Sequence, residues 1–257
     1  MLSKAKLKYI RSLELKKNRR AEHVFVAEGP KVVGDMLPYF PCRLLVATDG
    51  WHAAHPEAVA DEKVNVTEEE LTRASFLKTP QEVMAVFGYD DDDVCDTSLP
   101  LKELCLALDD VQDPGNLGTI IRLADWFGIR HIFCSPATAD AYNPKVVQAT
   151  MGALARVHLH YTPLPDLLCK LKEQGIPLYG TFLDGEDLYT KSLTANGLII
   201  MGNEGNGIST EVATFVNERL FIPNFPVGEP TSESLNVATA TAIICAEFRR
   251  RMRGDII

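Results

Sequence analysis

The chain has 257 residues, of which 46% are hydrophobic, and carries a formal net charge of −9; this length and composition suit a globular protein with one large domain or two smaller ones. No apolar run approaches the roughly 20 residues needed to span a bilayer, and the basic N-terminus lacks the apolar stretch of a signal peptide, so we expect a cytoplasmic protein with no membrane association. The six scattered cysteines form no Cys-x-x-Cys pair and have no histidine nearby at ligand spacing, which argues against both a bound metal and a disulfide framework.

The first 43 residues are basic although the whole chain is acidic. They hold ten Lys/Arg against four Asp/Glu, a local charge of +6, which leaves −15 for the remainder. Leu7, Ile10, Leu13 and Leu15 recur at roughly helical spacing, so residues 4–20 are predicted to form one basic amphipathic helix. Such a helix is compatible with phosphate-backbone contact, because counterion release depends on local charge, but a solvated helix without a partner explains it nearly as well. The candidate contact residues are Lys4, Lys8, Arg11, Lys16, Lys17, Arg19 and Arg20.

Short strands and helices alternate after this basic segment. Strands are predicted at 24–27, 43–47, 63–66 and 82–87, and helices at 31–37 and 68–76. Together these elements predict a small α/β domain over residues 1–89. The acidic, turn-rich residues 90–100 are typical of a linker, so a second domain is expected over 101–257.

The second domain has a more regular alternation of strands and helices. Strands are predicted at 104–108, 131–134, 157–161, 178–182, 198–201 and 220–222. Parallel strands need long crossovers and are covered on both faces, which matches the near-continuous apolar character of these runs and predicts a mostly parallel sheet. Because ligands collect at the carboxyl ends of such strands, the three unusual segments that follow strands 104–108, 198–201 and 220–222 are candidate site loops.

The loop after strand 198–201 is rich in glycine and asparagine and encloses one carboxylate, Glu204. Its residues 202–207 read GNEGNG, and glycines let backbone N–H groups approach a ligand closely and adopt positive φ. No Lys-Ser or Lys-Thr follows, which excludes a P-loop, and the third glycine of the dinucleotide fingerprint is missing. A tight turn in which Ser209 caps the next helix explains the loop about as well on its own.

The other two segments also combine a functional and a structural interpretation. Arg122 falls in the apolar run 120–124, where its guanidinium must either extend to solvent or pair with an acid, because an unpaired buried charge is costly. The structural interpretation is an arginine at the edge of a buried helix that forms an ion pair with a neighbouring aspartate. Asn116 is most simply a helix cap, and Ser234 and Asn236 could cap the last helix. That helix is rich in Ala and Thr on every face, which suits dense burial or a subunit interface.

Together the three segments resemble the SpoU (TrmH-type) branch of the SPOUT RNA methyltransferases, which carry Asn…Arg, Gly-Asn-Glu-Gly and Ser-Leu-Asn-Val motifs in this order. In this chain the motifs are Asn116 with Arg122, residues 202–205 and residues 234–237. Their joint occurrence at family-like separations is hard to attribute to chance. The resemblance covers about residues 104–253, and residues 25–29 in the N-terminal domain also look like part of the substrate-binding domain that many members carry.

The resemblance implies an α/β fold in which a C-terminal SPOUT domain, with a mostly parallel sheet and a deep trefoil knot, follows a small α/β substrate-binding domain; deep knots are rare exceptions among folds. It implies S-adenosyl-L-methionine bound bent between the second and third motif loops, with its adenine held by main-chain groups around Gly202, Ile222 and Leu235. It also implies a homodimer through the knot region and the last helix. The implied cofactor-binding residues are Met201, Gly202, Asn203, Gly205, Ile222, Pro223, Ser234, Leu235 and Asn236. The implied catalytic residues are Asn116, Arg122, Glu204, Ser234 and Asn236.

The implied reaction is methylation of a ribose 2′-hydroxyl in structured RNA, in which the site must hold the 2′-oxygen and stabilise a developing alkoxide. Arginine, with a pKa of roughly 12.5 to 13.8, is a poor base near neutrality, so we expect Arg122 to anchor a phosphate and polarise the hydroxyl, although an activated arginine base is also proposed for the family. The loop between Pro223 and Ser234 is longer than the compact family form, which predicts a different pocket rim.

The partner and the exact activity stay open at this point. Ribosomal RNA is favoured over transfer RNA because an appended substrate-binding domain is common among enzymes that act on it, which is an association rather than a physical argument. Alternatives are a tRNA 2′-O-methyltransferase, a weakly catalytic RNA-binding or ribosome-assembly factor on the same fold, and an enzyme that methylates a base. The pairing of Arg122 with Asn116 favours ribose over base.

Overall fold

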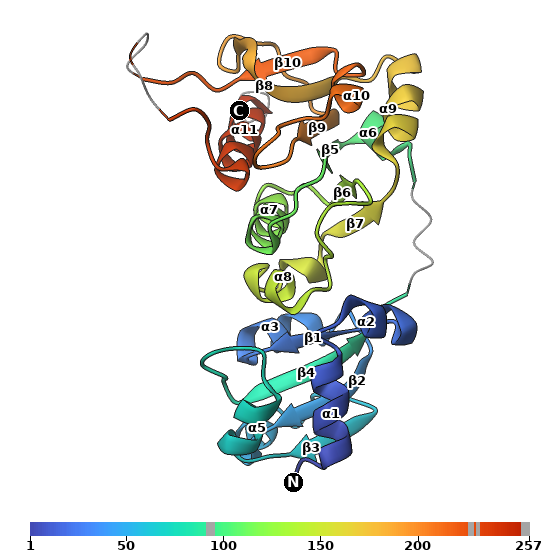
Figure 1. The fold of residues 1–257 in the computed structure, drawn as a ribbon, viewed down its shortest axis with the longest axis vertical. Coiled ribbons are helices and arrows are strands. Elements are labelled where there is room, and N and C mark those ends of the chain that lie inside the picture. Colours follow the sequence, from blue (N-terminus) through green and yellow to red (C-terminus); the bar gives the residue numbers. More distant parts are fainter. Residues whose placement is uncertain (91–95, 226–228, 230–231, 253–257) are drawn as a thin grey trace. The chain divides into compact units, whose positions relative to one another are not determined.

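The computed structural model describes residues 1–90, 96–225, 229 and 232–252 of the chain (Figure 1). Two compact units emerge, one formed by Met1–Asp93 with Asp140–Ala155 and the other by Val94–Ala139 with Arg156–Ile257. The predicted domains were continuous in sequence, whereas residues 140–155 pack with the N-terminal unit. Residues 91–95 of the predicted linker lie outside the described part of the chain. Within that part, none of the helices has the length and apolar character needed to cross a membrane.

The first unit is a four-stranded mixed sheet with helices on both faces. Its elements are α1 (Lys4–Ser12), α2 (Lys16–Glu22), β1 (Val24–Glu28), α3 (Pro30–Met36), β2 (Cys42–Ala47), α4 (Asp49–Ala54), β3 (Glu62–Asn65), α5 (Glu68–Ala74), β4 (Val83–Gly88), α8 (Pro144–Ala149) and the 3-10 turn Ala153–Ala155. The strand order is β1-β4-β2-β3, in which β4 runs antiparallel to both neighbours and β2 pairs with β3 in parallel. Apolar residues of α1 and α5 pack on one face of this sheet.

The predicted single helix over residues 4–20 is wrong, because the chain breaks between Ser12 and Lys16. Leu13 is fully buried, whereas Leu15, which helical spacing placed on the same face, is 53% exposed. The buried guanidinium of Arg19 donates hydrogen bonds to the backbone oxygens of Leu13 and Glu14, at 2.8 and 2.7 Å, and so holds the turn between the two helices. It also forms an ion pair with Asp140 within the same unit.

The second unit contains a six-stranded sheet in which every described strand pairing is parallel, as predicted. The strand order is β10-β8-β9-β5-β6-β7. Its elements are α6 (Leu99–Lys102), β5 (Leu104–Leu108), α7 (Pro114–Trp126), β6 (His131–Cys134), β7 (His158–Tyr161), α9 (Leu164–Glu173), β8 (Leu178–Asp187), β9 (Gly197–Met201), α10 (Thr210–Ala213), β10 (Glu218–Phe221) and α11 (Val237–Met252).

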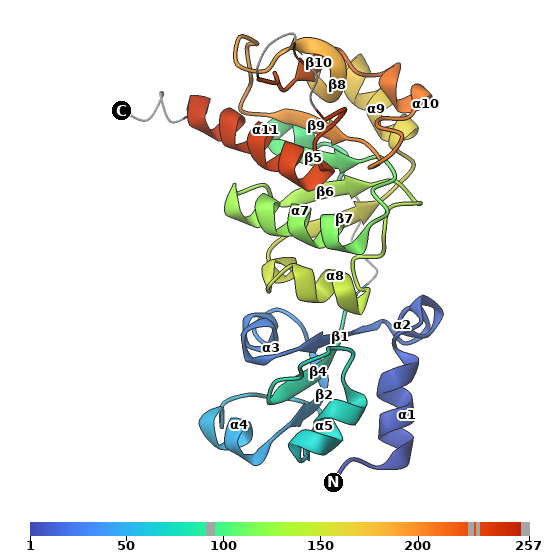
Figure 2. The same ribbon diagram turned by 60° about the vertical axis from the view of Figure 1, so that its left-hand side comes forward.

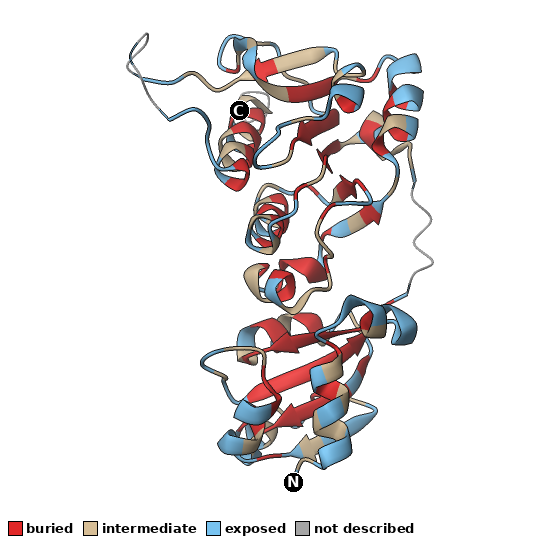
Figure 3. Ribbon diagram, in the orientation of Figure 1, coloured by how far each residue is buried: buried red, intermediate tan, exposed pale blue. Residues whose placement is uncertain are grey.

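The central strands of this sheet are buried because helices cover both faces (Figure 3). Every residue of β5 and β9 is buried, which is what their uninterrupted apolar sequences predict for parallel strands. Leucines of α9 and Val212 of α10 pack on one face. On the other face α7 lies against α11 (Figure 2).

Three segments follow the carboxyl ends of nearby strands: residues 109–113 after β5, residues 202–209 after β9 and, in its described part, residues 222–225, 229 and 232–236 after β10. Because β9 lies between β5 and β8, and β8 pairs with β10, the sheet order brings these strand ends to one edge. The predicted convergence is therefore confirmed. The segments after β5 and β9 follow adjacent strands, and a side-chain hydrogen bond from Asn236 to Asn116 joins the third segment to the first. The trefoil knot stays a prediction.

Candidate active site

The glycine loop after β9 folds back on itself through a small bridge. The backbone N–H groups of Asn203 and Gly207 each donate to the other residue's oxygen at 2.9 Å. The side-chain oxygen of Asn203 accepts from the N–H groups of Gly205 and of the next residue, at 2.9 and 3.0 Å. A Cβ atom at Gly202 would overlap the backbone at Gly207, and Gly207 itself has φ +68°. Glycine is thus required at position 202 and favoured at position 207 for the loop to close.

The carboxylate of Glu204 is held by donors from the loop after β5. One oxygen accepts from the backbone N–H of Asp113 at 3.1 Å and from Asn116 Nδ2 at 3.0 Å. The other accepts from the N–H of Gln112 at 3.3 Å and from Asn203 Nδ2 at 3.4 Å. Burial raises the pKa of Glu204, but the hydrogen bonds from Asn116 and the backbone outweigh it and bring the pKa below its usual value. Glu204 is therefore held as a carboxylate that joins the first and second motif segments.

A chain of side-chain hydrogen bonds extends from Glu204 to the third segment. Asn116 Nδ2 donates to Glu204, and Asn236 Nδ2 donates to Asn116 Oδ1 at 2.9 Å. Asn236 Oδ1 accepts from the N–H groups of Ala238 and Thr239 at the start of α11. Because an ionised carboxylate only accepts, it fixes the orientation of the first amide, and that amide fixes the second. The expected cap at Asn236 is confirmed, whereas the cap of α7 is Asp113 and not Asn116.

The loop after β5 is itself held in place from two sides. The carboxylate of Asp109 accepts from the N–H of Ser209 at 2.7 Å. Asp110 has φ 58°, a left-handed conformation that is uncommon outside glycine. The Ser135 hydroxyl at the end of β6 accepts from the Asp110 N–H and donates to its carboxylate, and the Asp110 carbonyl accepts from Asn203 Nδ2 at 2.8 Å. These contacts position the N–H groups that hold Glu204.

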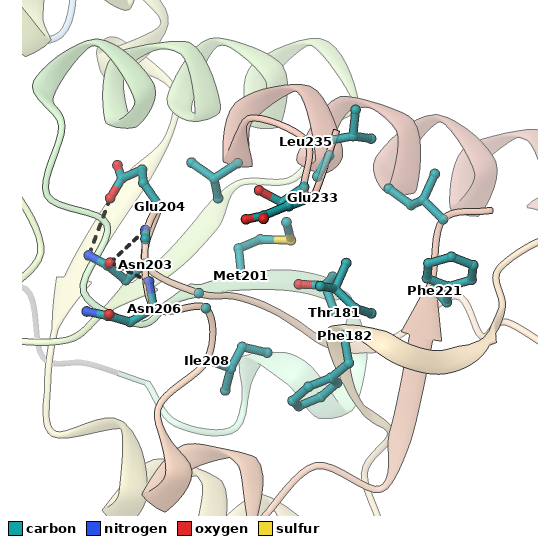
Figure 4. A pocket seen from close by; sticks show the side chains of 18 of the residues that line it. Thr181, Phe182, Met201, Asn203, Glu204, Asn206, Ile208, Phe221, Glu233 and Leu235 are labelled. Carbon is teal, nitrogen blue, oxygen red and sulfur yellow. Dashed lines mark hydrogen bonds between the residues drawn. The ribbon is translucent and has the colours of Figure 1, made fainter. Parts of the chain in front are cut away.

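A cavity of about 470 Å³ opens beside this network (Figure 4), within the range of roughly 300 to 1,000 Å³ that is usual for small-molecule sites. The glycine loop, the middle of β8, the end of β10 and the start of α11 contribute its walls. Its lining residues are Thr181, Phe182, Leu183, Met201, Gly202, Asn203, Glu204, Gly205, Asn206, Gly207, Ile208, Leu220, Phe221, Ile222, Glu233, Ser234, Leu235, Val237 and Ala240.

Most of the expected site residues lie at this cavity or in the network beside it. Among the expected cofactor-binding residues, those that line the cavity are Met201, Gly202, Asn203, Gly205, Ile222, Ser234 and Leu235. Pro223 and Asn236 are not part of the lining. Among the expected catalytic residues, Glu204 and Ser234 line it. Asn116 is connected to the cavity by its hydrogen bond to Glu204, and Asn236 by its hydrogen bond to Asn116. The expectation of a different rim over residues 223–234 falls partly on 226–228 and 230–231, outside the described residues.

Arg122 lies on α7, outside the cavity lining, and is exposed. It makes no hydrogen bond or ion pair to any residue that the structure describes. The aspartate one turn along α7, Asp125, instead pairs with Arg156, at 2.7 Å between Nη2 and Oδ2. The structural interpretation of Arg122, an arginine tied to a neighbouring aspartate, is therefore wrong, and its guanidinium faces solvent with its donors available to a ligand.

The sequence did not identify the part of the cavity that β8 contributes. The strand was predicted at 178–182 but continues to Asp187, and Thr181, Phe182 and Leu183 line the cavity. Arg219 stacks over the Phe182 ring, 3.5 Å from its centroid, and forms an ion pair with Asp184. No motif marks these residues. The available signal was that the strand predicted at 178–182 would end beside the β9 loop in a parallel sheet.

The basic residues of α1 and α2 are only partly available for binding. Those that are exposed are Lys4, Lys8, Arg11, Lys16, Lys17 and Arg20. The Arg11 guanidinium donates to the Ser75 carbonyl at 2.7 Å and lies over Phe76. The expectation that Arg19 contacts RNA is contradicted, because only 1% of it is exposed and its guanidinium is used within the protein.

Two parts of the chain match known protein families. Residues 103–246 match the SpoU rRNA Methylase family. Residues 4–85 match the MRM3-like substrate binding domain. The first match covers the three motif segments and the cavity, and the second covers most of the first unit.

Relatives extend over nearly the whole chain. The chain is 30% identical to the 23S rRNA (guanosine(2553)-2′-O)-methyltransferase RlmP of Bacillus subtilis, with 95% of this chain and 96% of the relative covered. Among solved structures, a TrmH-family protein from Porphyromonas gingivalis is 46% identical, with a TM-score of 0.87 over 98% of this chain and 99% of the other. The AdoMet-bound rRNA methyltransferase from Sinorhizobium meliloti is 30% identical, with a TM-score of 0.83 over 98% and 97%. The motif network, the family match and this coverage agree, and the chain belongs to the SpoU methylase family.

Proposed function

We propose that this protein transfers a methyl group from S-adenosylmethionine to a ribose 2′-hydroxyl of ribosomal RNA. The observation that carries the proposal is the hydrogen-bonded chain from Glu204 through Asn116 to Asn236, which joins all three motif segments beside a cavity of about 470 Å³. The relatives support the choice of substrate, since RlmP is named for 2′-O-methylation of 23S rRNA.

The residues of the cavity fit the proposed donor. Phe182, Ile208, Leu220 and Leu235 give it apolar surface, and the backbone of the glycine loop supplies polar groups without side-chain bulk. Its lining contains two carboxylates and no Lys or Arg among the described residues, which favours a ligand with positive charge. Main-chain groups around Gly202, Ile222 and Leu235 would hold the adenosine part.

When bound, S-adenosylmethionine supplies a methyl group on a positively charged sulfur. Arg122, exposed and without a partner among the described residues, would bind an RNA phosphate and donate a hydrogen bond to the 2′-oxygen as its proton leaves. Glu204 would keep its charge and hold the second motif segment against the first. Asn116 and Asn236 would keep the first and third segments at a fixed separation. Ser234 would position the third loop at the cavity wall.

The first unit would bind the RNA through its exposed basic face, defined by Lys4, Lys8, Lys16, Lys17 and Arg20. These side chains give a local positive charge on a chain of net charge −9, so RNA binding should weaken strongly with salt. We further propose that the second unit forms a homodimer through its predicted knot region, with α11 at the interface, and that the protein acts in the cytoplasm.

Methyl transfer from labelled S-adenosylmethionine to RNA from cells that lack the protein tests this function. We expect incorporation into ribosomal RNA and not transfer RNA, with the label on a 2′-O-methylnucleoside after digestion. Binding of the donor without incorporation would favour an RNA-binding or assembly factor, and label on a base would contradict ribose chemistry.

Arg122→Ala separates the proposed role of Arg122 from a role in folding. Because the side chain is exposed and has no partner among the described residues, the free energy of unfolding should change by less than about 0.5 kcal/mol. Methyl transfer should fall by about a hundredfold or more, because a donor to the developing oxyanion is lost. Arg122→Lys keeps the charge and should recover part of this loss; unchanged transfer in Arg122→Ala would remove Arg122 from the mechanism.

A further inference from the structure

Glu233 is an acid in the cavity wall that the three family motifs do not include. It lies one residue before the third motif, lines the cavity and is exposed. Figure 4 shows its carboxylate in the cavity near Met201 and Leu235. No hydrogen bond or ion pair joins Glu233 to any residue that the structure describes. Its charge is therefore available to whatever occupies the cavity.

The other acid of the lining, Glu204, is in a different situation. Four donors, two of them backbone N–H groups after β5, already surround its carboxylate. Its hydrogen bonds point to the first motif segment, so its charge is largely compensated by these dipoles. Because the described lining contains no Lys or Arg, Glu233 is the acid of this cavity whose charge is not balanced by the protein.

We propose that Glu233 distinguishes the charged methyl donor from the neutral product of the reaction. This inference rests on the proposed function, in which the bond from sulfur to the methyl carbon breaks, the bond from the ribose oxygen to that carbon forms, and the hydroxyl proton is released. The sulfur keeps the electron pair of the broken bond, so a sulfonium becomes a neutral thioether and the positive charge leaves with the proton. A carboxylate in the cavity favours the donor by its attraction to the sulfonium and loses that attraction once transfer is complete.

The expected size of the effect follows from Coulomb attraction in a partly open site. Unlike unit charges a few ångströms apart in a partly solvated site change a binding constant by roughly thirtyfold, and solvent reduces this effect at an exposed side chain. We therefore expect the ratio of donor to product affinity to change by about tenfold when the charge is removed. With such a preference, the donor would replace the product in the cavity after each transfer, because the product binds more weakly.

Calorimetric titration of the full-length protein with S-adenosylmethionine and with S-adenosylhomocysteine tests the proposal. Glu233→Gln keeps the shape of the side chain and removes its charge. We expect it to weaken donor binding by about tenfold and to change product binding by less than twofold. Sinefungin, which carries an amine in place of the sulfonium, should follow the donor. Glu229→Gln is the matched control, because it removes one charge from the same loop at an exposed residue outside the cavity lining, and it should leave both affinities unchanged.

Two results would overturn the proposal. Equal weakening of donor and product by Glu233→Gln would mean that the carboxylate contacts a group common to both, such as the ammonium or the ribose hydroxyls. Unchanged affinities for both ligands would mean that the carboxylate does not act on the ligand. The proposed RNA activity would fail separately if the protein bound the donor with this preference but methylated no RNA. If the unsubstituted protein did not bind the donor at all, both the role of Glu233 and the proposed function would be overturned.

Discussion

Three side chains, one from each motif segment, form the hydrogen-bonded chain that organises the cavity. Glu204 accepts from Asn116, and Asn116 accepts from Asn236, at 3.0 and 2.9 Å. Each amide uses both its donor and its acceptor, so replacing one member leaves an unsatisfied group on the next. The sequence singled out the three residues that the structure joins, because their types and order resemble a family; their roles in catalysis stay a prediction. The sequence did not reveal which of them hydrogen-bond to one another, since Asn116 had been interpreted as a helix cap.

Substitution of the two asparagines should reveal coupling between them. In a double-mutant cycle with Asn116→Ala and Asn236→Ala, we expect an interaction energy of about 1 kcal/mol in the free energy of unfolding, because they share a direct hydrogen bond. Denaturant unfolding of the four proteins measures this energy. Pairing of Asn116→Ala with Thr119→Ala, whose hydroxyl bonds only the backbone of its own helix, provides the control. Additive effects in the first cycle, within about 0.3 kcal/mol, would show that the chain of hydrogen bonds is not formed.

The lowered pKa of Glu204 should make the stability of the fold depend on pH. Burial alone would raise this pKa, but the donors around the carboxylate lower it. The ionised carboxylate thus stabilises the folded state at any pH above the pKa of Glu204 in the unfolded chain, roughly 4.3. This contribution disappears as the pH falls through the lower pKa of Glu204 in the folded protein. Compared with Glu204→Gln, the wild-type protein should be more stable by a constant amount from pH 8 to about pH 5, and the difference should shrink below about pH 4. A difference that instead grows with acid would contradict this assignment.

At the scale of elements, the sequence predicted strands better than helix ends. The runs at 104–108 and 131–134 match β5 and β6, because buried parallel strands are continuously apolar. The break between α1 and α2 was missed, since helical spacing could not show that Leu13 is buried while Leu15 is exposed. Helix α4 was also missed; it has only six residues, and a cap by Thr48 and burial of Trp51 hold it in place.

The buried Arg19 should be essential for the turn between α1 and α2. Arg19→Ala removes three hydrogen bonds and leaves Asp140 without its ion pair, so the free energy of unfolding should fall by about 3 kcal/mol. Arg20→Ala, its exposed neighbour, should change it by less than about 0.5 kcal/mol. Thermal or denaturant unfolding measures both. Equal, small effects of the two substitutions would mean that Arg19 belongs to the exposed basic face, as its sequence context suggested.

At the scale of the molecule, the chain passes from one compact unit to the other and back. Residues 140–155 pack with the N-terminal unit, although they lie between β6 and β7 of the second sheet in sequence. Tyr142 stacks on Tyr89 and Phe25, with ring centroids 4.0 and 5.0 Å apart. Sequence patterns report local periodicity and turn residues, so a continuous boundary near residues 90–100 was the natural prediction. They carry no signal for an inserted segment that completes another unit's core.

A fragment that ends at Asp93 should therefore be incomplete. It lacks Asp140, which pairs with Arg19, and the Tyr142 ring, so we expect broad, weakly cooperative thermal unfolding. A matched fragment with residues 140–155 joined by a flexible linker should recover a sharper transition at higher temperature. If the two fragments melt alike, residues 140–155 do not contribute to the stability of this unit.

The central claim is that three loops, joined through Glu204, Asn116 and Asn236, form one site for methyl transfer to ribose. The most direct test is to map 2′-O-methylation across the ribosomal RNA of cells in which the gene is deleted and then restored as wild type or as Arg122→Ala. We expect one site to lose its methyl group on deletion, to regain it with the wild-type protein and to stay unmethylated with Arg122→Ala although that protein is folded and present. A ribose methylation pattern that is unchanged by the deletion would show that these three segments do not form a site for methyl transfer to ribosomal RNA.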